Sequence, residues 1–261
     1  MTMHEEAAVK TETLNVEQVP GITHREWAVL GVTEYERVID LLRSLTPDEW
    51  AAPTACPPWD VRAMAGHMLG MAEGQARVRE FVRMARAASA TVKRDGGAWI
   101  DALTDLQVRE HASMTPAELI ARFAEVVPAA VRARRRTPAP LRRGVRMKQD
   151  PPFERERFSL GYILDTLSTR DPWTHRLDIS RAIGRPMVLT PEHDGRLIAD
   201  VVAEWAGRHG RSFSLTLTGI AGGQWSSGTG GETIEMDALE FCWTLSGRAP
   251  GSGLTATLVP F

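Results

Sequence analysis

The sequence is poor in cysteine, with Cys56 and Cys242 far apart among 261 residues. Two distant thiols favour a reducing compartment in which both stay free, so we expect a cytoplasmic protein. Residues 1–10 lack the apolar core of a signal peptide, and no run approaches the roughly 18 apolar residues of a membrane span. The net charge is −2, so the chain carries no excess of positive charge, and neither nucleic acid nor a membrane is an expected partner.

The remaining composition is that of an ordinary globular protein. Apolar residues make up 43% and charged residues 25%, which is sufficient for a packed core. The length fits one large domain or two ordinary ones. Eight tryptophans stand against two tyrosines, and we interpret the tryptophans as core packing residues.

Helical periodicity dominates the chain up to about residue 186. Residues 1–21 lack it and end at Pro20-Gly21, so we expect a flexible lead-in there. Apolar spacing, with capping residues at the starts and proline or glycine at the ends, predicts helices over 23–45, 61–90, 99–110, 115–135 and 153–183. The four main helices are predicted to pack as an up-down four-helix bundle over residues 22–186.

The character of the sequence changes near residues 185–190. Helices are expected over 192–208 and 237–245, and strands over 212–218 and 254–259. Glycine-rich turns at 222–223 and 228–231 flank further short strands. We therefore predict a small α/β domain over residues 187–261, which gives an α + α/β fold class.

His67 is the first candidate metal ligand. It lies two turns into the helix that Asp60 caps, beside Gly66 and Gly70. Each glycine costs a helix about 1 kcal/mol against alanine, so their presence indicates that something approaches this face. The alternative interpretation is close helix packing around a hydrogen-bonded core histidine.

Asp171 and His175 form the second part of the candidate site. They are four residues apart on one helix face, so both side chains can reach one point. A carboxylate and an imidazole together suit zinc or another divalent metal. Asp178 either orients His175 from behind or forms a surface pair with a neighbouring arginine. With His67 added, three ligands leave a metal position open, which is typical of a catalytic site.

The basic segment from Arg132 to Arg143 is typical of the end of the fourth predicted helix followed by a basic loop. Single runs of charge are usually solvated, so we expect the loop to be exposed. Binding of an anionic ligand is the alternative interpretation.

Two motifs resemble a known superfamily. Residues 59–67, preceded by Cys56-Pro57, resemble the first metal motif of the DinB-like four-helix bundles, and residues 169–179 resemble the second. The order of a metal-binding bundle and a small α/β domain is similar to the mycothiol-dependent maleylpyruvate isomerase family, whose small domain is sterol-carrier-protein-like. Residues 222–225 and 241–248 resemble the signature of that domain, so the resemblance covers residues 23–261.

The resemblance implies zinc, or another divalent metal, held by His67, Asp171 and His175. The maleylpyruvate isomerase has a glutamate where this chain has Asp171, and the shorter side chain could shift the metal. The resemblance also implies a catalytic arginine from the second domain, best matched by Arg248. The alternative interpretation of Arg248 is a positive charge near a helix C-terminus, where it interacts favourably with the helix dipole. Cys56 is not needed as a nucleophile, and we expect it to be structural.

The resemblance further implies a zinc-dependent enzyme that uses a low-molecular-weight thiol, mycothiol. The metal would lower the pKa of the thiol, which would then add to an electrophilic small molecule. The enzyme would act as an isomerase or an S-transferase, and as a monomer or homodimer. Two alternatives stay open: a thiol-independent metal-dependent hydrolase on the same bundle, and a small-molecule binding protein.

Overall fold

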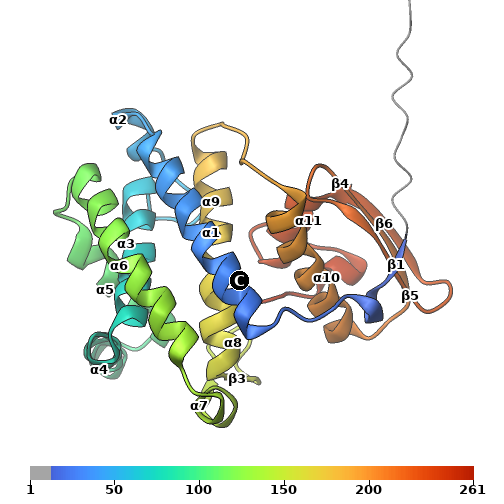
Figure 1. Cartoon of the computed structure of the whole chain (residues 1–261), viewed down its shortest axis with the longest axis horizontal. Helices are drawn as coiled ribbons and strands as arrows, with labels where there is room; N and C mark the ends of the chain where they lie inside the picture. The colour runs from blue at the N-terminus through green and yellow to red at the C-terminus, as the bar shows by residue number, and fades with distance from the viewer. Residues whose placement is uncertain (1–12) are drawn as a thin grey trace, which may run out of the picture. The chain divides into compact units, whose positions relative to one another are not determined.

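The computed structural model describes residues 13–261, which form two compact units (Figure 1). One unit is helical and covers Ile22–Met187. The other covers Val188–Pro260 together with residues 13–21. No helix within residues 13–261 is both long and apolar enough to cross a lipid bilayer.

The described end of the predicted lead-in differs from that expectation. Residues 1–12 of the lead-in lie outside the described residues. Leu14–Asn15 form strand β1, which pairs in parallel with β5 (Gly223–Ser227). Val16–Gln18 form a 3-10 turn in which Val16 is buried. Strand pairing and the burial of Val16 therefore attach these residues to the second unit, so they do not form a free segment.

The helices of the first unit begin at residues that the sequence marks as caps. Thr23, Thr46 and Thr115 each form a capping box with the glutamate three residues later. The elements are α1 (His24–Arg43), α2 (Pro47–Trp50), α3 (Val61–Ala76), α4 (Val78–Asp95), α5 (Trp99–His111), α6 (Pro116–Arg136), α7 (Ala139–Gly144), β2 (Arg146–Lys148), β3 (Arg157–Ser159), α8 (Leu160–Tyr162) and α9 (Ser168–Ala182).

Four of these helices form the bundle. α1 packs against α6 and α9, and α3 packs against the same two helices (Figure 1). Apolar side chains from each helix fill the centre, including Met64, Phe123 and Ile179. The buried ion pair of Arg176 and Glu34, with 2.7 Å between Nε and Oε1, also joins α9 to α1. The predicted four-helix bundle is confirmed.

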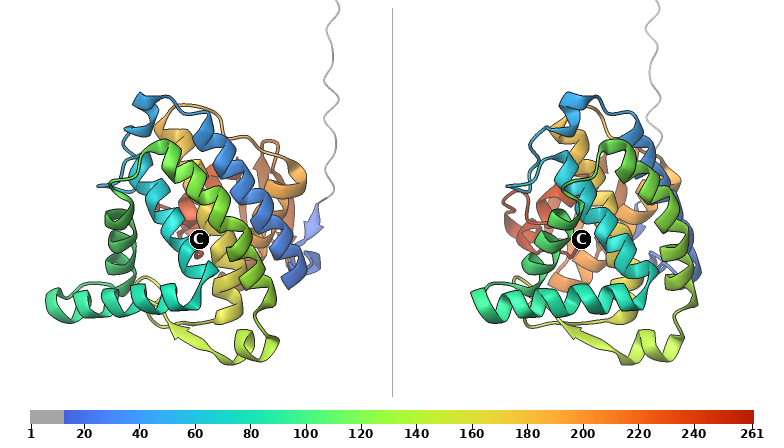
Figure 2. Two further views of the ribbon diagram at one scale, coloured as in Figure 1. Left: turned by 60° about the vertical axis from the view of Figure 1, so that its left-hand side comes forward. Right: turned by 90° about the vertical axis from the view of Figure 1, so that its left-hand side faces the viewer.

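The predicted helix over 61–90 is two helices. Arg77 has an extended backbone (φ −143°, ψ 114°), which ends α3 and starts α4 in a new direction. Figure 2 shows α4 running across the bundle helices. A Cβ on Gly74 would lie 2.7 Å from Cε of Met84, so the glycine allows α4 to pack against α3 just after the break. Arginine is compatible with a helix, which is why the break was not visible in the residue types.

The predicted helix over 153–183 begins later and is interrupted. Residues 157–159 form β3, which pairs antiparallel with β2. The ring of Phe158 lies 6.0 Å from that of Phe153 and 4.8 Å from that of Tyr162, which holds the hairpin against α8. Ile163–Leu167 then form a π-helical turn that leads into α9. A π turn holds one residue more than an α turn, and such turns occur frequently at functional sites.

The basic segment is largely helical. α6 continues to Arg136, and α7 follows almost at once. Arg134 is 3% exposed and donates to the carbonyls of Asp165 and Ser168 and to the hydroxyl of Thr169. Arg134 therefore lies in the predicted helix end but is not solvated, because carbonyl and hydroxyl oxygens replace water around its guanidinium group.

The second unit contains a mixed four-stranded sheet in the order β1-β5-β4-β6. β4 (Phe213–Thr218) pairs antiparallel with β5 and parallel with β6 (Glu232–Asp237). α10 (Arg196–His209) and α11 (Ala238–Leu245) complete the unit. The ring of Trp205 on α10 lies 4.8 Å from Phe213 and 5.2 Å from Phe241, which joins both helices to the sheet. The predicted α + α/β fold class is confirmed.

The predicted strand over 254–259 is wrong. Residues 253–256 form a 3-10 helix, in which Ser252 and Thr255 cap the backbone. The backbone N–H of Leu254 donates to the carboxylate of Glu232. One local bond and one bond to Glu232 on β6 therefore satisfy backbone groups that a strand would have offered to the sheet.

Tryptophans contribute to both cores as predicted. Six of the eight are buried: Trp27, Trp50, Trp173, Trp205, Trp225 and Trp243. Trp59 and Trp99 are half-buried, so their rings also remain open to contacts other than core packing.

Candidate metal centre

His67 is held inside the bundle by the helix that carries it. Asp60 starts α3 by accepting a hydrogen bond from the N–H of Ala63 at 2.7 Å. Met64 and Met68, one turn before and one residue after His67, are fully buried. His67 is only 3% exposed, so its polar ring needs partners within the protein.

Asp171 and His175 come from successive turns of α9. His175 is 6% exposed, whereas the side chain of Asp171 is 22% exposed. Nε2 of His175 lies 3.4 Å from Oδ1 of Asp171. The spacing of four residues therefore brings the imidazole and the carboxylate together, as the sequence predicts.

The two helices converge on the same carboxylate. Nε2 of His67 lies 3.6 Å from Oδ1 of Asp171, and the donor atoms of all three residues lie within 4.8 Å of one another. In a tetrahedral zinc site with bonds of about 2.0–2.1 Å, two ligand atoms lie about 3.4 Å apart. Two imidazole nitrogens and one carboxylate oxygen at these separations fit the donor set of a zinc site.

The other nitrogen of each ring has its own acceptor. Nδ1 of His67 donates to the amide oxygen of Gln107 at 2.8 Å, and Nδ1 of His175 donates to Oδ2 of Asp178 at 2.9 Å. Nε2 of each ring faces Asp171, so once a metal displaces any proton there, both Nε2 atoms can serve as ligands, the arrangement that metal-bound histidines usually have. Asp178 is fully buried, so its interpretation as half of a surface pair is wrong.

The glycines of α3 explain how Gln107 reaches His67. A Cβ on Gly70 would lie 2.6 Å from Cγ of Gln107, and one on Gly66 would lie 3.1 Å from Cβ of His111. Both contacts are made by α5, so the glycines serve close helix packing as the alternative interpretation proposed. The same packing gives His67 its acceptor, so the two interpretations describe one arrangement. Sequence reasoning missed Gln107, although Gly70 was the signal for it.

The site favours opposite charges on its carboxylate and imidazole. Burial raises the pKa of Asp171. The charge and hydrogen bond of His175, together with the contact with His67, outweigh burial and hold the pKa well below its usual range. Burial likewise lowers the pKa of His175, but Asp171 and then Asp178 raise it to about 9. Without a metal, His175 is therefore protonated near neutral pH, and its positive charge takes the place of a bound cation beside Asp171.

The sequence of the bundle matches the model of a known protein family. The model for the mycothiol maleylpyruvate isomerase N-terminal domain matches residues 33–180, more than half of the chain. The chain belongs to this family. Its matched range includes His67, Asp171 and His175, and membership confirms the predicted resemblance and the predicted class of enzyme.

Solved structures agree with membership in the mycothiol maleylpyruvate isomerase family. Crystal structures of the mycothiol-dependent maleylpyruvate isomerase, and of a histidine-to-alanine mutant of it, each match with a TM-score of 0.54. Each is 12% identical in sequence, and the match covers 91% of this chain and 93% of that chain. At this identity the likeness shows a shared fold. No curated protein gives a significant match.

The ring of Trp59 forms one wall of the site in this family member. Its centroid lies 5.1 Å from that of His67 and 6.5 Å from that of His175. The thiol of Cys56 lies 3.8 Å from Oδ2 of Asp178, the acceptor of His175. Cys56 therefore contacts Asp178, which holds the candidate ligand His175. The structural role expected of Cys56 would be exerted through this contact.

Arg248 follows α11 in the second unit. Its guanidinium carbon lies 5.9 Å from the centre of the Trp243 ring, which is a cation–π contact within that unit. This contact orients the side chain locally. The catalytic role implied for this arginine by the resemblance to the maleylpyruvate isomerases stays a prediction.

Proposed function

We propose that this chain is a zinc-dependent enzyme that adds a low-molecular-weight thiol, mycothiol, to an electrophilic small molecule. The reaction would be an isomerisation, if the thiol later leaves, or an S-transfer, if it stays. Membership in the mycothiol maleylpyruvate isomerase family supports the thiol, and the residues of the candidate site support the metal.

One observation carries the proposal. The Nε2 atoms of His67 and His175 lie 3.6 Å and 3.4 Å from one oxygen of Asp171. A structural zinc site is usually closed by four protein ligands, whereas three ligands leave a position for a reactant. The partial exposure of Asp171 is consistent with access from one side.

The residues of the chain have separable tasks in this mechanism. Bound zinc would supply a positive charge that stabilises a thiolate or polarises a carbonyl oxygen. His67, His175 and Asp171 would hold the metal, and Gln107 and Asp178 would keep both rings in the required tautomer. Trp59 would exclude water from the side of the rings that it covers. Arg248 would stabilise negative charge on the substrate.

Metal content and turnover test the proposal together. The purified chain should bind one zinc per molecule by mass spectrometry, and His67→Ala and His175→Ala should each lose most of it. His209→Asn serves as the matched control, because that ring packs against Trp205 and belongs to no group of candidate metal ligands among residues 13–261. The loaded protein is then incubated with mycothiol and a panel of electrophiles, maleylpyruvate included, and the products are identified by mass.

The outcomes separate the candidate functions. An adduct or an isomerised product that requires both zinc and mycothiol supports the proposal. Turnover of any substrate by the zinc form without a thiol would favour the hydrolase instead. Stoichiometric zinc without turnover on the whole panel would favour a binding protein with a structural metal.

The proposed role of Arg248 has its own test. Arg248→Lys keeps the charge but loses the planar fork, so we expect kcat to fall by roughly 10²-fold, as when one charge-stabilising donor is removed. Zinc content should be unchanged. Unchanged turnover in the variant would remove Arg248 from the mechanism and leave the metal proposal intact.

A further inference from the structure

A cavity of about 390 Å³ lies in the first unit, at the end of the bundle that holds the π-helical turn. The start of α1, α7 and the segment from Ser159 to Thr166 line it. Its volume falls within the range of small-molecule sites, which is roughly 300–1,000 Å³. The basic segment of the sequence supplies part of its wall, through Arg142 and Arg143.

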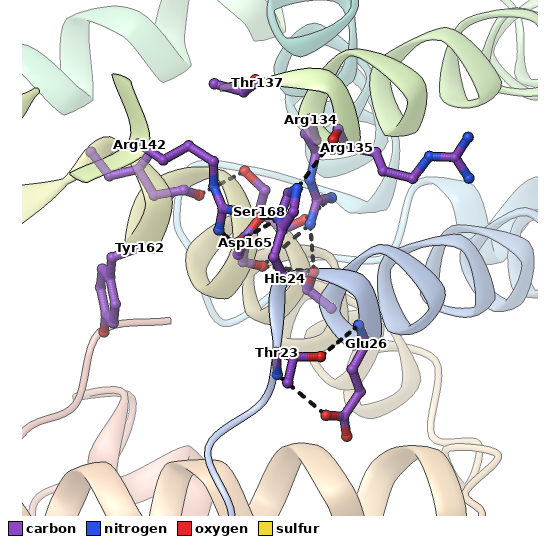
Figure 3. Close-up of polar contacts among 12 residues, drawn as sticks. Thr23, His24, Glu26, Arg134, Arg135, Thr137, Arg142, Tyr162, Asp165 and Ser168 are labelled. Carbon is purple, nitrogen blue, oxygen red and sulfur yellow. Dashed lines mark hydrogen bonds and ion pairs between the residues drawn. The ribbon is translucent and has the colours of Figure 1, made fainter. Parts of the chain in front are cut away.

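The carboxylate of Asp165 is already engaged at this cavity. Nδ1 of His24 lies 3.0 Å and 3.1 Å from its two oxygens, and Nη2 of Arg142 donates to Oδ2 (Figure 3). Nε2 of His24 lies 3.2 Å from the carbonyl oxygen of Arg135. The single acidic side chain of the lining is therefore held from two sides, and its charge is shared between the groups that hold it.

Positive charge remains in excess around the cavity. Arg143 lines it and forms no ion pair with a carboxylate in the described part of the chain. Nε of Arg142 is buried and has no hydrogen-bond partner among residues 13–261. Burial and then the charge of Arg143 lower the pKa of Arg142 below its usual value. Two guanidinium groups against a single carboxylate at one cavity are the elements of an oxyanion site.

The charge excess extends over the whole segment. Residues 132–157 carry ten lysines and arginines against three acidic residues, in a chain whose net charge is −2. The lining also includes Ile22, Trp27 and Tyr162, whose side chains are apolar or aromatic. A ligand that fits this lining combines an anionic group with an apolar or planar part.

We propose that this cavity binds a small organic oxyanion, a carboxylate or a phosphate ester, through Arg142 and Arg143. The ring surface of Trp27 and Tyr162 contacts the apolar part of the ligand. Asp165 keeps Arg142 in place rather than competing with the ligand. This site lies beyond the proposed function, which it neither requires nor supports, because its residues are distinct from the three candidate metal ligands.

Calorimetric titration of the full-length chain tests the proposal with four probes. Benzoate and phenyl phosphate each carry an oxyanion on a ring, benzamide is the neutral match of benzoate, and inorganic phosphate lacks the ring. We expect saturable binding of benzoate or phenyl phosphate, one per chain, and binding of benzamide at least tenfold weaker. The stronger of the two anions identifies carboxylate or phosphate as the source.

Charge-removing variants locate the binding. Arg143→Gln should weaken it at least tenfold, and Arg142→Gln should do the same. Arg143 is exposed, so its variant stays informative if loss of the Arg142–Asp165 pair unfolds the protein. Arg86→Gln, which removes an exposed arginine from α4, is the matched control and should bind like the parent chain. His67→Ala should also bind like the parent, because the anion does not use the metal.

Four results would overturn the site. They are absence of saturable binding for both ring anions, equal affinity for benzamide and benzoate, equal loss in Arg143→Gln and Arg86→Gln, and loss of binding in His67→Ala. Binding of heparin without binding of either small anion would likewise overturn it, in favour of a polyanion surface. None of these results alters the zinc measurement that tests the proposed function.

Discussion

The amide oxygen of Gln107 lies 2.8 Å from Nδ1 of His67 and joins α5 to the helix that carries the first candidate ligand. An amide oxygen only accepts, so Nδ1 of His67 donates in this contact and Nε2 is the nitrogen that faces Asp171. His175 has a carboxylate in the same position, Asp178, at 2.9 Å. Both rings therefore donate from Nδ1, to acceptors of different charge, and present Nε2 to the candidate metal position.

Removal of the amide should weaken metal binding while the fold persists. Gln107→Leu keeps the side-chain volume but leaves Nδ1 of His67 without an acceptor. Loss of such a support typically costs 10–100-fold in metal affinity, so we expect a change of about that size in a zinc competition titration. Gln149→Leu, in the segment between β2 and β3, is the control, and an unchanged affinity in Gln107→Leu would show that the contact does not orient the ring.

A methyl group at Gly70 should disturb the same contact through the backbone. Its Cβ would lie 2.6 Å from Cγ of Gln107, so α5 has to move or Gln107 has to leave. Overpacking of this kind costs about 1–3 kcal/mol, which a urea unfolding curve of Gly70→Ala should show. Gly207→Ala on α10 is the matched control, since nothing lies within 4 Å of its Cβ, and it should stabilise by about 0.5–1 kcal/mol. Equal effects at both positions would contradict the packing argument.

Zinc binding should release a proton from His175. The carboxylates of Asp171 and Asp178 overcome the effect of burial and raise its pKa to about 9, so the metal-free ring is protonated at neutral pH. A bound metal needs the Nε2 lone pair, and affinity should therefore rise with pH until about 9. Calorimetry in buffers of different ionisation enthalpy should give about one proton per zinc at pH 7, and fewer as the pH approaches 9. A proton count that does not change with pH would contradict this assignment.

The pair of His111 and Glu73 should make stability depend on pH. Burial lowers the pKa of His111, but the hydrogen bonds that its ring donates to Glu73 and to the carbonyl of Gln107 raise the pKa above its usual value, with 3.3 Å between Nε2 and Oε2 of Glu73. The pair thus contributes stability that is fully present below the unfolded histidine pKa and is lost as pH rises through the folded one. His111→Gln should therefore lose more free energy of unfolding at pH 5.5 than at pH 8.5.

The control for this pH effect leaves the pair in place. Arg122→Gln removes the second partner of Glu73, the guanidinium group at 2.7 Å, together with the pair of Arg122 and Glu125. Its loss of stability should vary less between pH 5.5 and 8.5 than that of His111→Gln. A larger loss at pH 8.5 in the histidine variant would reverse the sign and exclude the pair as its cause.

The sequence indicated the parts of the site that local spacing governs. Asp171 and His175 share a face because they are four residues apart, and His67 is buried because it lies among apolar residues of a capped helix. Gln107 was not predictable in the same way, since its contact depends on which helix packs against Gly70. The choice between two roles for Asp178 needed burial, which only the assembled bundle provides.

The errors in the fold have a common physical source. Arg77 ends α3, and Leu254 lies in a 3-10 helix, although neither residue disfavours the element that was predicted for it. In both places tertiary contacts decide, through Met84 against Gly74 and through Glu232 against the N–H of Leu254. Single-residue preferences of about 0.5 kcal/mol or less are too small to oppose such contacts.

The π-helical turn at Ile163–Leu167 takes up one residue more than an α turn, just before the helix that carries Asp171 and His175. A residue added to a plain α-helix would rotate every later side chain by about 100°, whereas a wider turn absorbs most of that rotation locally. The chain can therefore hold a surplus residue beside the cavity while both candidate ligands keep their direction toward His67.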